Sequence, residues 1–285
     1  MPTSRLPIIA ALFALYVIWG STYFAIRIGV ESWPPLLMAA VRYLLAGCML
    51  FAWAKWRGQA TPARREVAGA ALLGLLMPAI GNGLVTMAET EVSSGVAALV
   101  VAAVPLFTTL FARFLGQRTR PKEWLAMGLG LCGIVILNQG SNLSASPRGA
   151  LLLIIACTGW ALGSALSKKV PQPKGSMSSA VMMLTGGAEL LLFSLLRGEH
   201  LSHMPSLSGW LALSYLVVFG SIIAFSAYIY LLTHASPATA TSYAYVNPVI
   251  AVLLGMALLG EHVGVQEWSG MAVIVSAVLL LAWRR

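Results

Sequence analysis

The chain has 285 residues, of which 59% are hydrophobic and only 9% are charged. Soluble domains carry about 25% charged residues, so this chain cannot cover its surface with polar groups in water, and a soluble enzyme is excluded. The formal net charge is +9 and Asp is absent, but the bases lie in short loops between apolar runs. There they indicate membrane orientation, and we expect no nucleic-acid partner.

A membrane-spanning helix needs about 20 largely uncharged residues. Charges and turn residues divide the chain into ten such pieces, so the sequence predicts an all-α integral membrane protein with ten transmembrane helices. The first piece is longer than a signal-peptide core and has no cleavage site directly after it, so we read it as a helix of the mature protein. The pieces cover residues 7–29, 34–55, 67–88, 93–114, 122–139, 149–168, 176–196, 207–233, 237–259 and 267–284.

Lys and Arg are distributed unequally between the two sets of loops. One set, together with both ends of the chain, contains fourteen of them. The other set contains only Arg148 and Arg197, with Arg27 near its edge. Because cytoplasmic loops carry the excess of Lys and Arg, both termini are predicted to be cytoplasmic.

The two halves of the sequence resemble each other at a nearly constant offset of 141 to 144 residues, which indicates duplication. The predicted repeats are residues 1–142 and 146–285, with five helices each. Since five is an odd number, the second copy has to insert upside down. The matching features are Trp19 with Trp160, Pro105 with Pro248, and Glu123–Met127 with Glu267–Met271.

An inverted repeat around a central site is the architecture of secondary transporters. Two copies that exchange conformations give two states of similar energy, one open to each side of the membrane. The duplication therefore predicts transport by alternating access.

A family pattern is visible in several segments, which are Trp19–Thr22, Arg42–Ala46, Ala97–Leu110, and Tyr245–Gly255 followed by Leu259-Gly260-Glu261. These segments resemble the EamA-type drug/metabolite transporters, and within that family the bacterial exporters of aromatic and other amino acids. One departure is Gln117-Arg118, where the family usually has Gly-Glu.

The resemblance implies that this chain is a bacterial inner-membrane protein and that it exports small metabolites without ATP or a cofactor. It implies a central cavity walled by helices 1, 3, 4, 6, 8 and 9, with helices 5 and 10 behind it. The expected partners are the lipid bilayer and a small molecule, most simply an amino acid, and the expected functional unit is a monomer. Another metabolite or a drug remains an alternative substrate.

Polar and aromatic residues recur at helical spacing on the same helices, and such stripes are expected to face the interior. Ser and Thr can instead bond their own backbone, and Trp and Tyr can belong to the interfacial belts. The candidate substrate-binding residues are Trp19, Tyr23, Asn82, Thr86, Trp160, Ser164, Tyr228, Tyr243, Tyr245 and Asn247.

Arg42 and Glu189 are ionisable residues well inside predicted spans, each eight residues from the outer end. Arg42 could bind a substrate carboxylate and Glu189 could bind a proton. Their matched depth favours an ion pair that fixes helix packing. With its one embedded acid paired in this way, the chain is expected to be a facilitator driven by the substrate gradient.

Proline and glycine mark the expected moving parts, because each weakens a helix or frees a backbone carbonyl. Helices 3 and 4 would rock against helices 8 and 9 about these points. The candidate hinge residues are Pro78, Gly81, Gly83, Pro105, Gly220 and Pro248.

Catalytic motifs are weak or absent in the sequence. There is no phosphate-binding loop and no H-E-x-x-H zinc motif, and Glu199-His200 with His203 is read as a polar turn and not as a metal site. An intramembrane hydrolase is a distant alternative. It would need a base, and His234, the only histidine near a span, lies at a predicted cytoplasmic end.

The loop charges make a testable prediction about topology. A reporter enzyme fused after Arg285 should report a cytoplasmic location, and the same reporter inserted beside Arg197 should report a periplasmic one. Reporter activity in whole cells measures both. A periplasmic signal from the fusion at Arg285 would contradict the predicted orientation.

Overall fold

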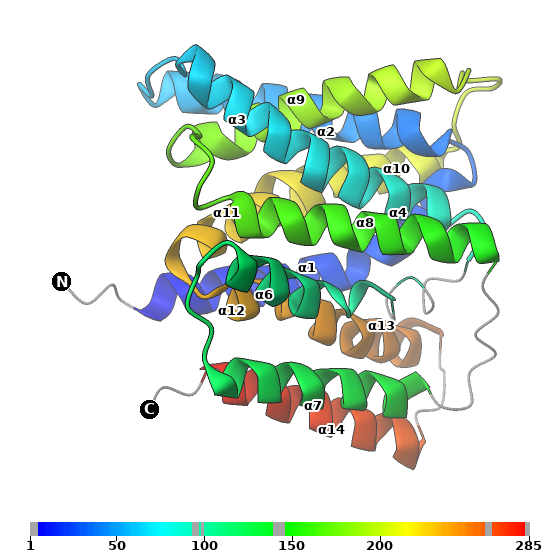
Figure 1. Ribbon diagram of the computed structural model, residues 1–285. Helices are drawn as coiled ribbons and strands as arrows, with labels where there is room; N and C mark the ends of the chain where they lie inside the picture. Colours follow the sequence, from blue (N-terminus) through cyan, green and yellow to red (C-terminus); the bar gives the residue numbers. More distant parts are fainter. Residues whose placement is uncertain (1–4, 93–96, 98–99, 139–145, 260–263, 283–285) are drawn as a thin grey trace.

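The polypeptide is helical throughout the part that the computed structural model describes, which comprises residues 5–92, 97, 100–138, 146–259 and 264–282. Figure 1 shows the helices lying side by side in a layered bundle, with the start of the first and the end of the last on the same side. The elements are α1 (Arg5–Val30), α2 (Pro35–Trp56), α3 (Arg64–Gly74), η1 (Leu75–Asn82), α4 (Gly83–Ala88), α6 (Val104–Phe114), α7 (Pro121–Asn138), α8 (Pro147–Leu166), α9 (Ser176–Leu196), α10 (Leu207–Tyr215), η2 (Leu216–Ile223), α11 (Ala224–His234), α12 (Pro237–Thr241), α13 (Tyr243–Leu259) and α14 (Val265–Ala282).

Six helical stretches in these ranges are long and apolar enough to cross a bilayer. Large apolar side chains cover the outside of the bundle; Phe13 is 68% exposed and Leu196 is 75% exposed. Such a surface suits lipid and not water. The six stretches are Leu6–Val30, Pro35–Trp56, Arg64–Ala88, Pro147–Leu166, Ser176–Leu196 and Leu207–His234, and shorter apolar helices cover Val104–Phe114 and Trp268–Leu280.

Two helix pairs form opposite ends of the bundle, α2 with α9 and α7 with α14 (Figure 1). Glycine allows the close approach within the first pair: a Cβ on Gly47 would lie 2.9 Å from the Leu184 backbone nitrogen, and one on Gly187 would lie 2.9 Å from the Leu44 nitrogen. Small residues at such contacts are typical of helices that associate in membranes, where apolar burial gives no advantage over lipid.

The central helices lie between these pairs and contain interruptions. The helix that starts with α3 and the helix that starts with α10 each contain an eight-residue π-helical stretch, η1 and η2, before they continue as α4 and α11. The two stretches begin 141 residues apart, which equals the offset between Trp19 and Trp160. Pro78 lies inside η1, where the wider turn accommodates its missing N–H donor.

The predicted fourth and ninth spans differ from the observed elements. Residues 93–96 and 98–99 of the fourth span lie outside the described residues, as do residues 139–145 between the predicted repeats and the Gly260-Glu261 pair. The observed helix α6 begins at Val104, so Pro105 lies in its first turn and not in a helix interior. The ninth span is divided at Ser242 into α12 and α13.

The α7–α14 contact makes a prediction that a matched control can test. A Cβ on Gly133 would lie 2.7 Å from Cγ1 of Ile274 on α14, whereas one on Gly128 of the same helix would meet no atom within 4 Å. Overpacking an interior contact costs about 1–3 kcal/mol. Gly133→Leu should therefore lower the melting temperature of the purified protein in detergent, and Gly128→Leu should leave it nearly unchanged. Equal melting temperatures for the two variants would contradict this packing.

Candidate functional site

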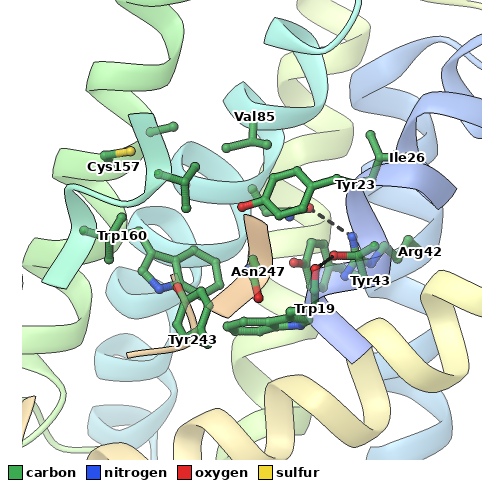
Figure 2. Close-up of a pocket in the computed structure, with 16 residues that line it drawn as sticks. Trp19, Tyr23, Ile26, Arg42, Tyr43, Val85, Cys157, Trp160, Tyr243 and Asn247 are labelled. Carbon is green, nitrogen blue, oxygen red and sulfur yellow. Dashed lines mark hydrogen bonds between the residues drawn. The ribbon is translucent and has the colours of Figure 1, made fainter. Parts of the chain in front are cut away.

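A cavity lies among the central helices and is lined by residues of α1, α2, η1, α4, α6, α8 and α13 (Figure 2). Its volume is about 60 Å³. Small-molecule sites usually enclose about 300–1,000 Å³, so the cavity is closed down in this conformation. Six of the ten candidate substrate-binding residues line it: Trp19, Tyr23, Asn82, Trp160, Tyr243 and Asn247.

Aromatic rings form one wall of the cavity, with Trp19 of α1 at their centre. The Trp19 ring meets the Trp160 ring of α8 edge-on, with centroids 5.4 Å apart, and meets the Tyr243 ring at 4.6 Å. Edge-to-face contacts at these distances are favourable for aromatic pairs. They hold apolar faces toward the cavity without filling it.

Tyr228 and Ser164 lie behind this wall and do not line the cavity, which corrects the expectation that they do. The Tyr228 hydroxyl lies 2.6 Å from the Ser164 Oγ, and Trp160 donates its indole N–H to the same hydroxyl at 3.1 Å. Both residues are buried. Because a buried indole N–H needs an acceptor, Tyr228 fixes the orientation of the Trp160 ring.

Two further candidates also lie away from the cavity wall. Thr86 donates its hydroxyl to the backbone carbonyl of Asn82, one turn earlier on the same helix. Tyr245 packs against α7: its ring is 3.0 Å from the position of a Cβ on Gly130, and it belongs to a separate apolar cluster with Met127 and Ile134. The predicted cavity positions of these two residues are wrong.

Arg42 of α2 brings a positive charge to the cavity (Figure 2). Its side chain is 3% exposed. The Nε–H donates to Oγ of Ser221 in η2 at 2.8 Å, and Nη1 donates to Oδ1 of Asn82 at 3.2 Å. Both acceptors are neutral. Since Arg remains protonated in proteins, the guanidinium keeps its full charge and has no acid to balance it among the described residues.

The predicted ion pair between Arg42 and Glu189 is wrong. The register of α2 against α9, with Gly47 beside Leu184, places the two residues at similar heights. Their side chains nevertheless diverge, because Arg42 turns toward η2 and η1, whereas Glu189 is only partly buried and its Oε2 makes no hydrogen bond. Two residues at the same depth on neighbouring helices lie at the same height, but their side chains can point in different directions.

Glycines in both interrupted helices allow this arrangement. A Cβ on Gly220 would lie 2.9 Å from Nη2 of Arg42, so any larger residue at this position of η2 would require the end of the guanidinium to shift. The carbonyl of Gly220 accepts the indole N–H of Trp19 at 3.0 Å. In η1, a Cβ on Gly81 would lie 2.6 Å from Cε3 of Trp160. The candidate hinges Gly81 and Gly220 thus also shape the cavity.

The other candidate hinges occupy several kinds of position. Gly83 begins α4 directly after η1, and Pro248 lies inside α13. Neither position shows motion by itself. Pro78 lies in the π-helical stretch η1, as Gly81 does, and such stretches often mark functional sites.

Part of the lining was missed by sequence reasoning. Thr22 and Ile26 line the cavity three residues after Trp19 and Tyr23, and Cys157 lines it one turn before Trp160. Helical spacing alone would have found all three. Ile26 was passed over because only polar and aromatic residues were sought, although an apolar substrate would need apolar walls. Thr22 and Cys157 were not among the candidates either.

A second hollow of about 870 Å³ lies between α2, α9 and α11. It is much larger than the central cavity, but Met49 and Trp53 on its rim are exposed on the outer surface of the bundle. In a membrane this hollow would face lipid. The central cavity, with converging rings and a buried charge, is the better candidate for a substrate site.

The cavity offers three kinds of contact to a small molecule. The rings of Trp19 and Trp160 present apolar faces, the Arg42 guanidinium can attract an anion, and Oδ1 of Asn247 is a buried acceptor without a hydrogen bond. The described part of the chain contains no group of three His, Cys, Asp or Glu side chains that could hold a metal ion. The three kinds of contact suit recognition of a small molecule.

Known proteins resemble this chain over nearly its whole length. YedA of Escherichia coli (strain K12), described as an uncharacterized inner membrane transporter, is 55% identical over 277 residues, which cover 97% of this chain and 90% of YedA. The protein PecM of Dickeya dadantii is 27% identical, covering 94% of this chain and 91% of PecM. A solved crystal structure with 23% identity covers 97% of this chain and 98% of its own, with a TM-score of 0.81, which shows the same fold.

The family resemblance noted in the sequence extends over nearly the whole chain. Residues 6–139 and, separately, residues 147–283 match the EamA-like transporter family. The two matches cover nearly all of the chain. This protein belongs to the EamA-like transporter family.

Proposed function

We propose that this protein is a secondary transporter of the bacterial inner membrane that exports amino acids, including aromatic ones, by alternating access. Membership of a transporter family supports the movement of a small molecule across a membrane. The observation that carries the choice of substrate is the buried guanidinium of Arg42, which lies beside an aromatic wall and has no acidic partner among the described residues.

The guanidinium favours a substrate with a carboxylate. An unpaired charge inside a membrane protein is costly, so such residues usually mark a substrate or ion pathway. Ser221 and Asn82 hold the group by Nε and Nη1. An incoming carboxylate would supply the missing negative charge, and charge-assisted hydrogen bonds to Arg are strong and directional.

An amino acid also needs sites for its ammonium and its side chain. The unbonded Oδ1 of Asn247 can accept a hydrogen bond from the ammonium. The rings of Trp19, Trp160 and Tyr243 suit an apolar or aromatic side chain. Such contacts do not select one side-chain shape, so we expect broad specificity. An anionic metabolite without an ammonium is the alternative substrate.

Alternating access follows from the size of the cavity and from the repeats. A cavity of about 60 Å³ cannot admit an amino acid, so binding requires the walls to move. In our proposal residues 1–142 and 146–285 are inverted five-helix repeats that provide ten spans, with both termini cytoplasmic. The equal spacing of η1 with η2 and of Trp19 with Trp160 supports this symmetry.

The moving parts in this proposal are the interrupted helices. The elements around Pro78, Gly81, Gly83 and Pro105 would rock against those around Gly220 and Pro248. Cavity-lining residues come from both halves of a single chain, so the functional unit is proposed to be a monomer.

The aromatic wall makes a testable prediction. Trp160→Ala and Tyr243→Ala should each reduce uptake of labelled phenylalanine into proteoliposomes by at least about tenfold, because truncating a buried aromatic contact costs a few kcal/mol. Trp268→Ala is the matched control, since Trp268 is 52% exposed on the outer surface. Full flux in both cavity variants would show that the aromatic wall is not part of the substrate pathway.

The guanidinium makes a second prediction. Arg42→Gln should weaken competition by unlabelled phenylalanine by at least about tenfold, while competition by phenylalaninamide, which lacks the carboxylate, changes little. The ratio of the two inhibition constants is the measured quantity, because general misfolding would not change it selectively. Arg197→Gln, at an exposed arginine, should preserve the ratio. An unchanged ratio in Arg42→Gln would show that the carboxylate binds elsewhere.

A further inference from the structure

Glu89 is a buried acid to which the proposed transport cycle has so far given no role. It follows the last residue of α4 and is fully buried, and neither carboxylate oxygen makes a hydrogen bond. Residues 82, 85 and 89 recur at helical spacing, so Glu89 lies on the same helix face as Asn82 and Val85, which line the cavity. The carboxyl group therefore lies just beyond one end of the cavity.

The charged groups around Glu89 leave its carboxyl unpaired. On α1, the guanidinium of Arg27 lies within electrostatic range of the Glu89 carboxyl. Its Nη1 donates to the backbone carbonyl of Glu89 at 2.6 Å, and it forms no ion pair with the carboxylate. On α8, Arg148 is occupied by Glu91, 3.0 Å away. On α2, Arg42 is bonded to residues deeper in the bundle.

Tyrosines and a cysteine are the remaining titratable groups on the neighbouring elements. Tyr23 of α1 lies within electrostatic range of Glu89, and its hydroxyl is hydrogen-bonded to the side chain of Asn247. Tyr43 lies on α2 and Cys157 on α8, and both line the cavity. None of these groups supplies a positive charge. Arg27 is the exception among the neighbours, but it bonds the backbone carbonyl, and its attraction offsets only part of the cost of burying a carboxylate at Glu89.

An ionised carboxylate in this position would be desolvated, unpaired and without hydrogen bonds. Buried charges in proteins are paired or become neutral, so Glu89 has to hold a proton in the closed conformation. When the cavity opens to water, the same group can ionise. One residue then changes its protonation with the conformation of the transporter.

We propose that Glu89 is a proton-binding site that couples export of the substrate to inward movement of a proton. The inference rests on the proposed transport function. It replaces the expectation that the protein is a facilitator driven by the substrate gradient. That expectation took Glu189 to be the one acid embedded in the membrane.

Electrostatics fixes the direction of coupling. An ammonium held by Asn247 and a proton on Glu89 disfavour each other, because both add positive charge near Tyr23 in a medium of low dielectric constant. Substrate binding from the cytoplasm therefore releases the proton to that side. After the substrate has left on the outer side, the Glu89 carboxylate takes up one proton there, which balances the cycle as an antiport.

Proton binding can be tested without any substrate. Infrared spectra of the reconstituted protein should show the C=O band of a protonated carboxylic acid at neutral pH, and part of that band should disappear in Glu89→Gln. Glu91→Gln is the matched control two residues away and should leave that part unchanged, and Glu189→Gln identifies any share from the other embedded acid. A spectrum in which Glu89→Gln removes no protonated band would overturn the proton site.

Coupling is tested with labelled phenylalanine in proteoliposomes. Inside-acid vesicles should accumulate it, and for one proton per substrate each unit of pH difference supports roughly a tenfold ratio. Glu89→Gln, which keeps the shape of the protonated acid, should lose this accumulation while counterflow exchange remains measurable, and Glu91→Gln should retain it. Melting temperatures verify that both variants fold.

The outcomes separate the two proposals. Exchange of phenylalanine without any response to pH, or gradient-driven accumulation that persists in Glu89→Gln, would overturn the coupling and leave the transport function standing. Accumulation in inside-alkaline vesicles would overturn the antiport direction. Absence of any phenylalanine flux in the wild type would instead contradict the proposed substrate, and the infrared titration would still decide whether Glu89 binds a proton.

Discussion

One guanidinium inside the bilayer constrains much of the central structure. Gly220 of η2 leaves room for Arg42 at the cavity, because a Cβ there would lie 2.9 Å from Nη2 and the guanidinium would have to shift. Ser221 of η2 and Asn82 of η1, both neutral, accept hydrogen bonds from this one side chain. Because lipid offers no hydrogen bonds, these few protein groups have to satisfy the charge. The two interrupted helices are thereby tied to α2 at a single point.

The sequence was sufficient to predict the long continuous helices because the requirement for apolar length in a bilayer is strict. The α2–α9 and α7–α14 pairs are continuous helices, and their bounds agree with the predicted spans to within a few residues. The interruptions could not be predicted in the same way. A π-helical stretch such as η1 keeps the hydrophobicity of its neighbours and changes only the backbone hydrogen bonds, so no composition signal marks it.

Two errors in the candidate site, the place of Tyr245 and the Arg42–Glu189 pair, have one geometric cause: position along a helix was used without rotation around it. Tyr243 and Tyr245 are two residues apart, which is about 200° around a helix, so they cannot both face the cavity. Tyr243 lines it and Tyr245 packs against α7. Arg42 and Glu189 were paired by depth for the same reason, although their side chains leave the α2–α9 contact in different directions.

The π-helical stretches η1 and η2 lie in the central helices, between the two outer helix pairs. The outer pairs are locked by glycine contacts, Gly47 and Gly187 at one end and Gly133 at the other, where even a single Cβ would clash. Opening the cavity by separating these pairs would break such contacts. Bending at η1 and η2 would leave the outer pairs intact, but it would loosen the contact of η1 with α8, where a Cβ on Gly159 would lie 2.7 Å from Cγ2 of Ile80. Arg42 is bonded to η2, and Glu89 follows η1 by one short helix, so a bend there would move both charges relative to the substrate.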